Sequence, residues 1–500
     1  MTSTVLWSLI AIQIAMGAFD TLYHHELTER LAWRPSQRRE LLLHGVRNLL
    51  YALLFVSLGW FELRGVFADI ITAILASELI ITLADFVEED MSRKLPATER
   101  INHTLLALNY GAILVLLVPV LLSWAHEPTG VVRSYHQNWS WLAAVAAAAV
   151  IALGLRDLAA AFRTTRLAPK AAGALMTALP RNQTVLVTGA TGFVGSRLVG
   201  ALVAQGHSVI ALTRDPKKAL ALPPPFRVVT DLEQIPSDTK IDAVVHLAGE
   251  SISGGLWTER RKRAVIQSRV DITRAVEALV ARLAHRPAAF VNASAIGWYG
   301  LRGDEALTEF GDFRSCFSHD SCEACEAAAL KLMRLGIRVV NLRVGLVLGT
   351  EGGLLARLLT PFEFGLGGPI GSGRQWMSWI ARDDLVRLIA HAIVTPSLTG
   401  PVNATAPAPV RNREFARELG SALHRPAFLP LPALPLRLLG GDFAKELLLG
   451  GQCVLPHKAL KSGFAFRHPE LRGALQSILG NEFDRRRHMR LDVTERMKLT

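Results

Sequence analysis

The pattern of hydrophobic and polar positions changes near residue 165 of this 500-residue chain. Before that point the chain carries five long apolar runs, each close to the roughly 20 residues that a helix needs to cross a lipid bilayer. They cover 5–22, 43–60, 66–86, 104–124 and 139–155. We therefore expect residues 1–165 to form an all-α transmembrane bundle of about five spans.

After residue 183 the apolar residues fall into short runs that alternate with helical periods. Residues 185–187 predict a buried parallel strand, 196–205 a helix and 208–212 a second strand. This alternation indicates an α/β fold with a doubly wound parallel sheet of the Rossmann type. We expect a linker over 166–183, the dinucleotide-binding domain over 184–400, a small C-terminal substrate lobe over 401–480 and a basic tail over 481–500.

The first strand leads into a glycine-rich turn of the form G-x-x-G-x-x-G, with Gly189, Gly192 and Gly195. The first glycine permits a tight turn, the second lets backbone N–H groups approach a pyrophosphate, and the third permits close packing of helix on strand. The positive end of the helix dipole lies at the same place. Strand, turn, helix and strand together predict a bound nicotinamide dinucleotide. The other turn residues expected to contact it are Thr191, Phe193 and Val194.

The residue after the second strand distinguishes NADP from NAD. An acidic side chain there binds the ribose 2′-hydroxyl of NAD, whereas an arginine accommodates the 2′-phosphate of NADP. Here Arg214 comes first and Asp215 follows, with Lys217 and Lys218 nearby. We expect NADP as the cofactor, with NAD bound through Asp215 as the alternative.

Further motifs follow in an order that resembles the extended short-chain dehydrogenases/reductases: DAVVHLAG, SRVDITRAVEAL, VNASAIGWYG and LRVGLVLG. Two later stretches, GGPIGSGRQWMSWIARDDL and GQCVLPHKALKSGFAFRHPELRGAL, are similar to the atypical subgroup called the epimerase family. That subgroup is an NAD(P)-dependent epimerase/dehydratase group with its own C-terminal domain. The resemblance covers about 184–479, and we recognise no family for the five apolar runs.

The resemblance implies roles for residues along the predicted sheet. The glycines of the turn would line the pyrophosphate, and Arg214 would lie at the adenosine ribose. Asp231 would meet the adenine amino group, and Ala248 and Gly249 would lie along the cofactor. Ser294 would supply the active-site hydroxyl, although an alignment anchored on residues 299–300 would put Ala295 there instead.

The chain departs from the extended family at the acid/base pair. Extended members carry Tyr-x-x-x-Lys, in which the lysine lowers the pKa of the tyrosine. At the expected place this chain reads Cys322-x-x-x-Glu326. We hypothesise that Tyr299 or Glu326 supplies the proton group instead. Cys322 and Cys325 also form a C-x-x-C pair, which is either a redox or metal pair or a set of small side chains that fill a helix face.

Basic residues of the first 165 positions gather in two connections between the apolar runs. One connection carries Arg30, Arg34, Arg38 and Arg39, another carries Arg93, Lys94 and Arg100, and the other two carry only Arg64 and Arg133. The positive-inside rule then places the N-terminus outside and the chain after the fifth run in the cytoplasm. We therefore expect an integral protein of a bacterial inner membrane with a cytoplasmic dinucleotide domain.

Composition agrees with this expectation and limits the classes of partner that we expect the protein to bind. Hydrophobic residues make up 50% of the chain, and the formal net charge is +12. The sequence contains no long Lys/Arg stripe with interleaved aromatic residues, so nucleic acid is disfavoured and a lipid bilayer is the expected partner. The four cysteines form no disulfide framework and suit a reducing compartment.

Histidines and carboxylates recur at helical spacing near the ends of the apolar runs. Three i, i+4 pairs and one further aspartate would each face one side of a helix. They are Asp20 and His24, Glu40 and His44, Glu99 and His103, and Asp85. At the cytoplasmic ends of four spans they would form a di-metal site, in the manner of carboxylate four-helix bundles. The alternative is solvation at the interface or pairing with nearby arginines, and an isolated His25 supports no assignment.

These features predict a membrane-tethered NAD(P)-binding oxidoreductase or epimerase-like enzyme that acts at the cytoplasmic face on a small, lipophilic substrate. Arg343 would bind an anionic group of that substrate or form a structural ion pair. The missing Tyr/Lys pair favours two alternatives. One is an NADP(H)-sensing binding protein without turnover, and the other is a membrane metal or redox domain coupled to the cofactor domain.

Overall fold

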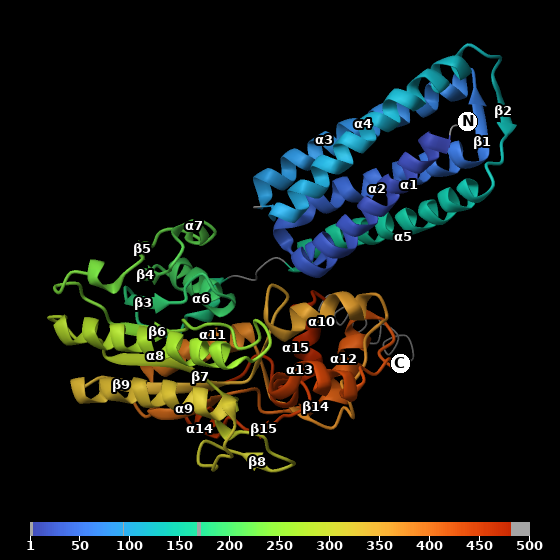
Figure 1. Ribbon diagram of the computed structural model, residues 1–500. Helices are drawn as coiled ribbons and strands as arrows, with labels where there is room; N and C mark the ends of the chain where they lie inside the picture. The colour runs from blue at the N-terminus through green and yellow to red at the C-terminus, as the bar shows by residue number, and fades with distance from the viewer. Residues whose placement is uncertain (1–3, 94, 168–171, 482–500) are drawn as a thin grey trace, which may run out of the picture. The chain divides into compact units, whose positions relative to one another are not determined.

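The computed structural model describes residues 4–93, 95–167 and 172–481, and the chain divides into two compact units, Met1–Ala168 and Pro169–Thr500 (Figure 1). The division lies within a few residues of the predicted end of the bundle at 165. Lys94, part of the predicted linker and nearly all of the predicted basic tail lie outside the described residues.

The N-terminal unit consists of five long helices and a short two-stranded sheet. The helices are α1 (Thr4–Phe19), α2 (Arg38–Trp60), α3 (Val66–Ser92), α4 (Ala97–Ala125) and α5 (Asn138–Leu167). The chain continues from α1 as a π-helix, η1 (Asp20–Glu29), followed by the 3₁₀ turns η2 (Leu31–Trp33) and η3 (Pro35–Gln37). Strands β1 (Phe61–Arg64) and β2 (Gly130–Arg133) pair antiparallel. The five helices are long and apolar enough to cross a membrane, and each predicted apolar run lies within one of these helical segments.

Helices α2 and α5 approach each other closely because glycines face one another at their contact. A Cβ on Gly154 would lie 3.0 Å from the carbonyl oxygen of Gly45, and one on Gly45 would lie 2.6 Å from Leu158. Small residues of this kind let helix backbones come together where apolar burial alone gives little drive. The remaining interior is filled by side chains such as Leu54, Leu75 and Leu117.

The C-terminal unit is built on a seven-stranded parallel sheet with the order β13-β9-β7-β6-β3-β4-β5. The strands are β3 (Thr184–Thr188), β4 (Ser208–Leu212), β5 (Arg227–Val229), β6 (Ala243–His246), β7 (Ala289–Ala295), β9 (Arg338–Val344) and β13 (Gly400–Ala404). The principal helices beside them are α6 (Phe193–Ala204), α8 (Glu259–Arg282), α9 (Phe317–Leu330) and α11 (Arg382–Val394). The predicted doubly wound sheet is confirmed.

Alternate residues of each strand enter two separate cores, one on each face of the sheet. Val185 and Val187 pack in the core that contains α6 and α11, whereas Leu186 packs in the core that contains α8. A strand that is apolar on both faces is typical of a parallel sheet covered by helices on both sides. This explains why the run at 185–187 shows no polar alternation.

Beyond the sheet, four helices form the C-terminal lobe: α12 (Asn412–Leu423), α13 (Ala433–Leu447), α14 (His457–Lys461) and α15 (Leu471–Ile478). Strand β13 spans the predicted boundary at residue 400 and pairs with β9, so it is part of the sheet. A short parallel pair of β15 (Cys453–Val454) with β8 (Ala306–Leu307) connects the lobe to the loops that follow β7.

Candidate functional site

The glycine-rich turn lies at the carboxyl end of β3 and has the geometry that only glycine permits. Gly189 has a φ of +69°, and a Cβ there would lie 2.8 Å from the backbone of Leu247 and Ala248. Its backbone therefore lies against the segment that follows β6, at a conformation that other residues adopt only with strain. The first glycine of the motif forms the tight turn, as expected.

The other two glycines open a space at the start of α6. Gly195 is buried against the carbonyl oxygen of Gly189, so a side chain there would separate the helix from the turn. Gly192 is exposed, precedes α6 and provides no side-chain cap. The first N–H groups of the helix therefore have no intrahelical acceptors and no side-chain cap, and the positive end of the helix dipole lies beside them. These residues fit a pyrophosphate, and with it an NAD(P) cofactor.

The side chains expected at the adenosine end lie at the ends of the next strands. Arg214 is exposed directly after β4. Asp215 is occupied locally, because its carboxylate accepts a hydrogen bond from the Lys217 backbone N–H at 3.0 Å and caps the short helix α7 (Pro216–Ala219). Asp231 is likewise exposed and accepts a hydrogen bond from the Glu233 N–H at 2.9 Å.

Ala248 and Gly249 follow β6, on the same edge of the sheet as the glycine turn. The Ala248 N–H donates to the Thr188 hydroxyl at 3.2 Å, which fixes this segment beside the end of β3. Gly249 is exposed, and a Cβ there would lie 3.0 Å from the Arg269 side chain. Both residues therefore lie where a cofactor extended along the carboxyl ends of the strands would pass.

Ser294, Glu326 and Arg343 meet at the carboxyl ends of β7 and β9. The Ser294 hydroxyl donates to Glu326 Oε1 at 2.7 Å. Arg343 donates from Nε and Nη2 to the two oxygens of the same carboxylate, each at 3.0 Å. The guanidinium carbon also lies 3.4 Å from the ring centre of Trp298. Arg343 thus holds the Glu326 carboxylate in one orientation beside the Ser294 hydroxyl. Of the two candidate positions, 294 and 295, only residue 294 carries a hydroxyl.

Tyr299 takes a different position from the one expected of a proton donor. Its ring is completely buried, and its hydroxyl donates to Asn403 Oδ1 on β13 at 2.7 Å. Burial raises the pKa of the phenol above its usual range. The environment of Tyr299 favours a structural role, and Ser294 and Glu326 remain as the polar groups that face each other.

The C-x-x-C pair has the surroundings of packed helix residues. Cys322 and Cys325 are free and buried on α9. Burial raises the pKa of the Cys322 thiol to about 12 and also raises that of Cys325. Because the thiolate is the reactive and metal-binding form, a protonated pair argues against redox or metal chemistry here.

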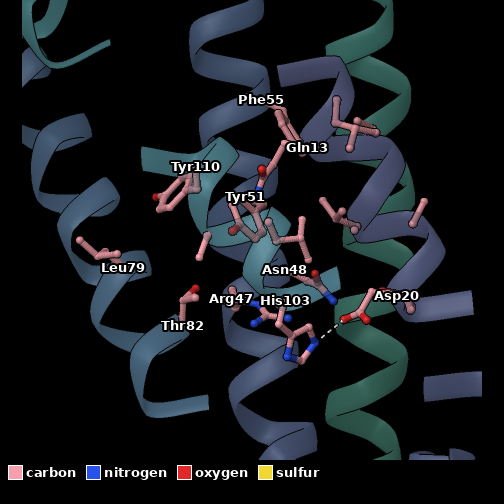
Figure 2. Close-up of a pocket in the computed structure, with 18 of the residues that line it drawn as sticks. Gln13, Asp20, Arg47, Asn48, Tyr51, Phe55, Leu79, Thr82, His103 and Tyr110 are labelled. Atoms are coloured by element: carbon pink, nitrogen blue, oxygen red, sulfur yellow. Dashed lines mark hydrogen bonds and ion pairs between the residues drawn. The ribbon is translucent and has the colours of Figure 1, made fainter. Parts of the chain in front are cut away.

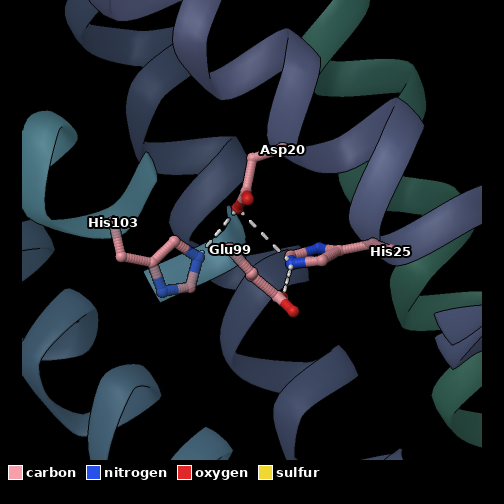
Figure 3. Close-up of side chains that lie close together, drawn as sticks. All are labelled: Asp20, His25, Glu99 and His103. Carbon is pink, nitrogen blue, oxygen red and sulfur yellow. Dashed lines mark hydrogen bonds and ion pairs between the residues drawn. The ribbon is translucent and has the colours of Figure 1, made fainter. Parts of the chain in front are cut away.

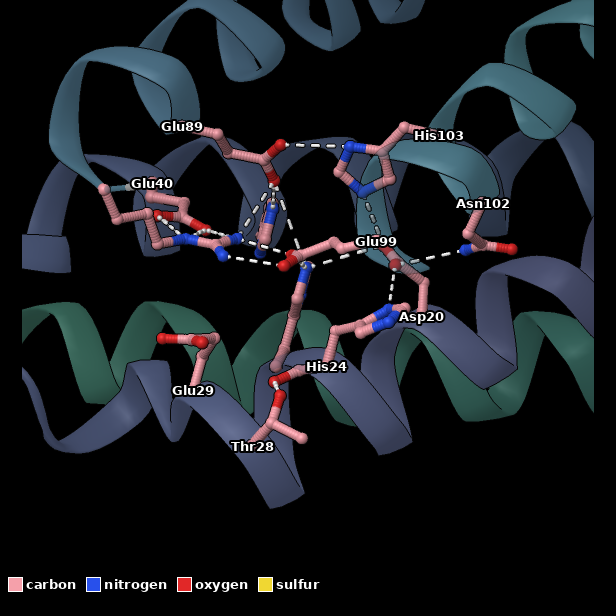
Figure 4. A network of polar contacts seen from close by, with 12 residues as sticks. Asp20, His24, Thr28, Glu29, Glu40, Glu89, Glu99, Asn102 and His103 are labelled. Carbon is pink, nitrogen blue, oxygen red and sulfur yellow. Dashed lines mark hydrogen bonds and ion pairs between the residues drawn. The ribbon is translucent and has the colours of Figure 1, made fainter. Parts of the chain in front are cut away.

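In the N-terminal unit, histidines and carboxylates from η1, α2, α3 and α4 converge in the interior of the bundle (Figure 4). Two overlapping sets of four have ligand atoms within 4.8 Å of one another: Asp20, His25, Glu99 and His103, and His25, Glu40, His44 and Glu89. Figure 3 shows the first of these sets. All seven residues are buried, so they are not solvated at an interface. The other part of the alternative, pairing with nearby arginines, is present, because Arg93 pairs with Glu40 at 3.0 Å and with Glu99 at 2.7 Å.

Five of the seven metal ligands predicted from sequence lie in these two sets, and two do not. His24 has both ring nitrogens engaged, with Nδ1 2.8 Å from Asp20 Oδ1 and Nε2 3.2 Å from the Thr98 hydroxyl. Asp85 lies next to the sets and pairs with His44 at 3.0 Å and Arg47 at 2.6 Å. The geometric sets thus contain His25 and Glu89 in place of His24 and Asp85, and metal binding itself stays a prediction.

The π-helix explains why His25 joins these sets and His24 does not. In an α-helix residues i and i+4 share a face, but the wider turn of a π-helix brings i and i+5 together as well. Asp20 and His25 therefore face the same interior, with 3.5 Å between Oδ2 and Nε2. Glu89 was detectable from sequence, because it stands at i+4 from Asp85 on the same face of α3.

A cavity of about 310 Å³ opens inside the bundle next to this cluster (Figure 2). Apolar and aromatic side chains such as Ile14, Phe55 and Leu114 line most of it. Asp20 and His103, which belong to the first set of ligands, also line it. The cavity therefore joins an apolar interior to the buried polar cluster.

Comparison with known proteins defines the C-terminal unit. The NAD dependent epimerase/dehydratase family matches residues 185–403, and a domain of unknown function (DUF1731) matches residues 431–478. The chloroplastic epimerase family protein SDR39U1 homolog of Arabidopsis thaliana is 40% identical over 303 residues, which cover 59% of this chain and 86% of that protein. The human epimerase family protein SDR39U1 is 37% identical over 300 residues, which cover 59% of this chain and 99% of that protein.

The crystal structure of human SDR39U1 (isoform2) with NADPH aligns with a TM-score of 0.54 at 34% identity, and the match covers 60% of this chain and all of that one. The C-terminal unit is therefore a Rossmann-type dinucleotide-binding protein. The chain belongs to the NAD-dependent epimerase/dehydratase family, as its motifs indicated. Both family matches begin after residue 184, so they do not include the helices of the N-terminal unit.

Proposed function

We propose that this chain is an NADP(H)-dependent oxidoreductase or epimerase-like enzyme whose acid/base group is Glu326 beside Ser294. The observation that carries the proposal is the bidentate hold of Arg343 on Glu326, 2.7 Å from a hydroxyl at the carboxyl edge of the sheet. Ligands of open α/β sheets bind at that edge. Members of the extended family place a tyrosine and a lysine there, and this chain has neither.

NADP is the proposed cofactor because Arg214 is exposed and pairs with no carboxylate among the described residues, whereas Asp215 caps α7. The human relative was crystallised with NADPH, which supports the same choice. The glycine turn would hold the pyrophosphate, and Arg214 would hold the 2′-phosphate. Titration of the full chain with NADPH and NADH tests this, with R214A as the variant. We expect R214A to weaken NADPH binding about 10-fold and to leave NADH binding unchanged. Tighter binding of NADH than of NADPH by the parent chain would overturn the choice of NADP.

When bound, the nicotinamide ring accepts or supplies a hydride at the substrate carbon. The role of the chain is to hold the substrate oxygen and move its proton. The Ser294 hydroxyl can turn from Glu326 to the substrate oxygen, and the Glu326 carboxylate can accept the proton that this oxygen releases. Arg343 positions the carboxylate through two hydrogen bonds, so it is a positioning residue.

The experiment measures NADPH oxidation with carbonyl and quinone substrates for the parent chain and for E326Q. Glu323 on the same helix is exposed, so E323Q makes the same chemical change away from Ser294. We expect E326Q to lower kcat at least 100-fold with unchanged NADPH affinity, and E323Q to retain the activity. Equal activity of both variants would contradict the role of Glu326. Parent protein that binds NADPH but turns over no substrate would favour the NADP(H) sensor instead.

We further propose that the N-terminal unit is embedded in a membrane. The support is its distribution of polarity: ionisable residues such as Asp20 and Glu99 are buried inside, while Ile80, Leu108 and Val115 are more than half exposed on helices of spanning length. The exposed apolar side chains would be costly in water, whereas a bilayer solvates them. Ionisable residues of membrane segments face the interior of the bundle, as they do here. The full chain should stay with membranes through an alkaline wash and enter solution only with detergent. Release by the wash alone would refute the proposal.

The apolar cavity in the bundle supports a lipophilic substrate or ligand. Its volume suits a small molecule or part of a chain, and its walls offer few polar partners outside the end near Asp20 and His103. A filling substitution such as G17L, at a glycine that lines the cavity and has no other atom within 4 Å of its Cβ position, should block the ligand. Binding of a fluorescent isoprenoid or fatty-acid probe to parent and variant would show this, and equal binding would refute it.

A further inference from the structure

Four polar atoms in and beside the buried cluster of the bundle have no hydrogen-bond partner among the described residues. They are His25 Nε2, His44 Nε2, Asp85 Oδ1 and Glu89 Oε2. Buried polar atoms are normally satisfied, because each unpaired one costs about 1–3 kcal/mol. Four such atoms together in one interior indicate a missing partner that interacts with nitrogen lone pairs and carboxylate oxygens alike.

The histidine rings are oriented as ligands would be. His25 and His44 stack in parallel, with ring centres 4.5 Å apart and an angle of 6° between the planes. Their Nε2 atoms both face Glu89 Oε1, at 4.0 Å from His25 and 3.6 Å from His44. The other oxygen of Glu89 lies 3.3 Å from His103 Nδ1. Glu89 thus stands between two groups of nitrogens, with one oxygen toward each group.

The charges of the cluster are also incomplete. Five buried carboxylates meet there, and two arginines pair with them: Asp20, Glu40, Asp85, Glu89 and Glu99 with Arg47 and Arg93. Five negative charges against two positive charges leave three negative charges if the histidines are neutral. Buried charges without compensation are strongly unfavourable, so further positive charge is required.

We propose that the cluster binds a pair of divalent first-row transition-metal ions, one at each of its two overlapping sets of ligands. One ion would take Asp20, Glu99 and His103 through its Nε2, and the other would take Glu40, His44 and Glu89. His25 belongs to both sets and would give its ring nitrogen to one of the two ions. The four positive charges of the two ions would offset the three uncompensated negative charges and leave one positive charge.

The donor set decides the class of metal. Mixed imidazole nitrogen and carboxylate oxygen suits iron, manganese, cobalt or zinc, whereas magnesium and calcium take oxygen almost alone. Arg93 lies 2.7 Å from Glu99 and 3.0 Å from Glu40, and His24 lies 2.8 Å from Asp20. These contacts orient the carboxylates while leaving further oxygen lone pairs for a metal, as outer partners of metal ligands do.

Protonation of three histidines would balance the charge without a metal. His44 Nε2 lies 3.0 Å from Asp85 Oδ2, yet it makes no aligned hydrogen bond, and neither does His25 Nε2. A buried N–H that points past its acceptor would lose most of its interaction energy. A histidine nitrogen that coordinates a cation through its lone pair needs no aligned hydrogen-bond acceptor. The geometry therefore favours metal ions over protons, and the experiment separates the two.

The test uses the full chain purified in detergent, stripped with a chelator, dialysed and titrated with Co²⁺. We expect about two Co²⁺ per chain by elemental analysis and visible d–d absorption bands typical of nitrogen and oxygen ligands. No bound cobalt would overturn the proposal in favour of protonated histidines, and a ratio of one at saturation would overturn the pair of ions. NADPH binding is measured on the same samples, so failure of the metal site is distinguishable from failure of the cofactor proposal.

Variants at neighbouring histidines test the ligand set. H25A should lose about one Co²⁺ per chain, whereas H24A should keep two, because His24 has no free ring nitrogen. H126A, at an exposed histidine outside both sets, is the matched control. H25Q is tested beside H25A and circular dichroism is recorded for each variant, so a folding defect is recognised. Loss of cobalt from H24A but not from H25A would refute the assignment.

Discussion

The substitution G189A tests the cofactor turn, and G206A provides its control. Both glycines have positive φ, +69° at Gly189 and +77° at Gly206. An alanine at either position costs about 1 kcal/mol for the left-handed backbone conformation. The two differ in their surroundings, because a Cβ on Gly206 meets nothing within 4 Å, whereas one on Gly189 lies 2.8 Å from the backbone of Leu247 and Ala248.

The contact at Gly189 cannot relax by a side-chain rotation, because both partners are backbone. The turn must move away from the end of β6, at a further cost of about 1–3 kcal/mol by analogy with overpacked cores. We therefore expect G206A to lose about 1 kcal/mol of unfolding free energy and G189A about 3 kcal/mol. The displaced turn should also bind NADPH at least 10-fold more weakly, which corresponds to about 1.4 kcal/mol.

The assay combines two measurements on the full chain in detergent. Nicotinamide fluorescence on titration with NADPH gives the affinity, and urea unfolding followed by tryptophan fluorescence gives the stability. Unchanged NADPH affinity for G189A, or an equal loss of affinity in G206A, would refute the argument that the pyrophosphate lies on this turn.

Two further predictions concern buried titratable groups of the C-terminal unit. Burial lowers the pKa of His246 from 6.5 to about 4, so the unfolded chain binds a proton that the folded chain excludes. The free energy of unfolding therefore has its full value above pH 6.5 and falls by about 3 kcal/mol as the pH drops from 6.5 toward 4. H246Q should flatten this slope in urea unfolding measured against pH, and an unchanged slope would contradict it. The Cys322 thiol, with a pKa of about 12, should react with iodoacetamide at pH 7.5 only after unfolding, and rapid labelling of the folded chain, located by mass spectrometry, would contradict its protonated state.

The C-terminal fold was predictable because its evidence is local. The glycine turn at Gly189 depends on its own backbone conformation and on the strand and helix that flank it, all within about 30 residues. The Ser294–Glu326 contact was accessible only through the family resemblance. The position of Arg343 was not accessible from the sequence. Strands β7 and β9 and helix α9, which are distant in sequence, must come together before its guanidinium reaches Glu326.

Tyr299 shows what sequence reasoning about a site cannot supply. Its place directly after β7 made it a candidate proton donor, since loops at the carboxyl ends of strands carry catalytic groups. The ring instead points into the interior and bonds to Asn403 on β13, which is more than 100 positions away in the chain. The direction of a side chain within such a loop depends on what packs against it, and no local pattern contains that information.

The bundle shows the opposite relation between pattern and structure. Helical spacing correctly indicated that carboxylates and histidines would meet from four helices, because each i, i+4 pair needs only an α-helix to share a face. It selected His24, whereas the geometric sets contain His25, because the hydrogen-bond register changes to a π-helix at Asp20. Such a change costs energy within an isolated helix and persists where tertiary contacts compensate that cost. The register at Asp20 puts His25 beside Glu99 and Glu89 while leaving His24 to hold Asp20, so the irregular turn itself is what a metal centre at this point would require.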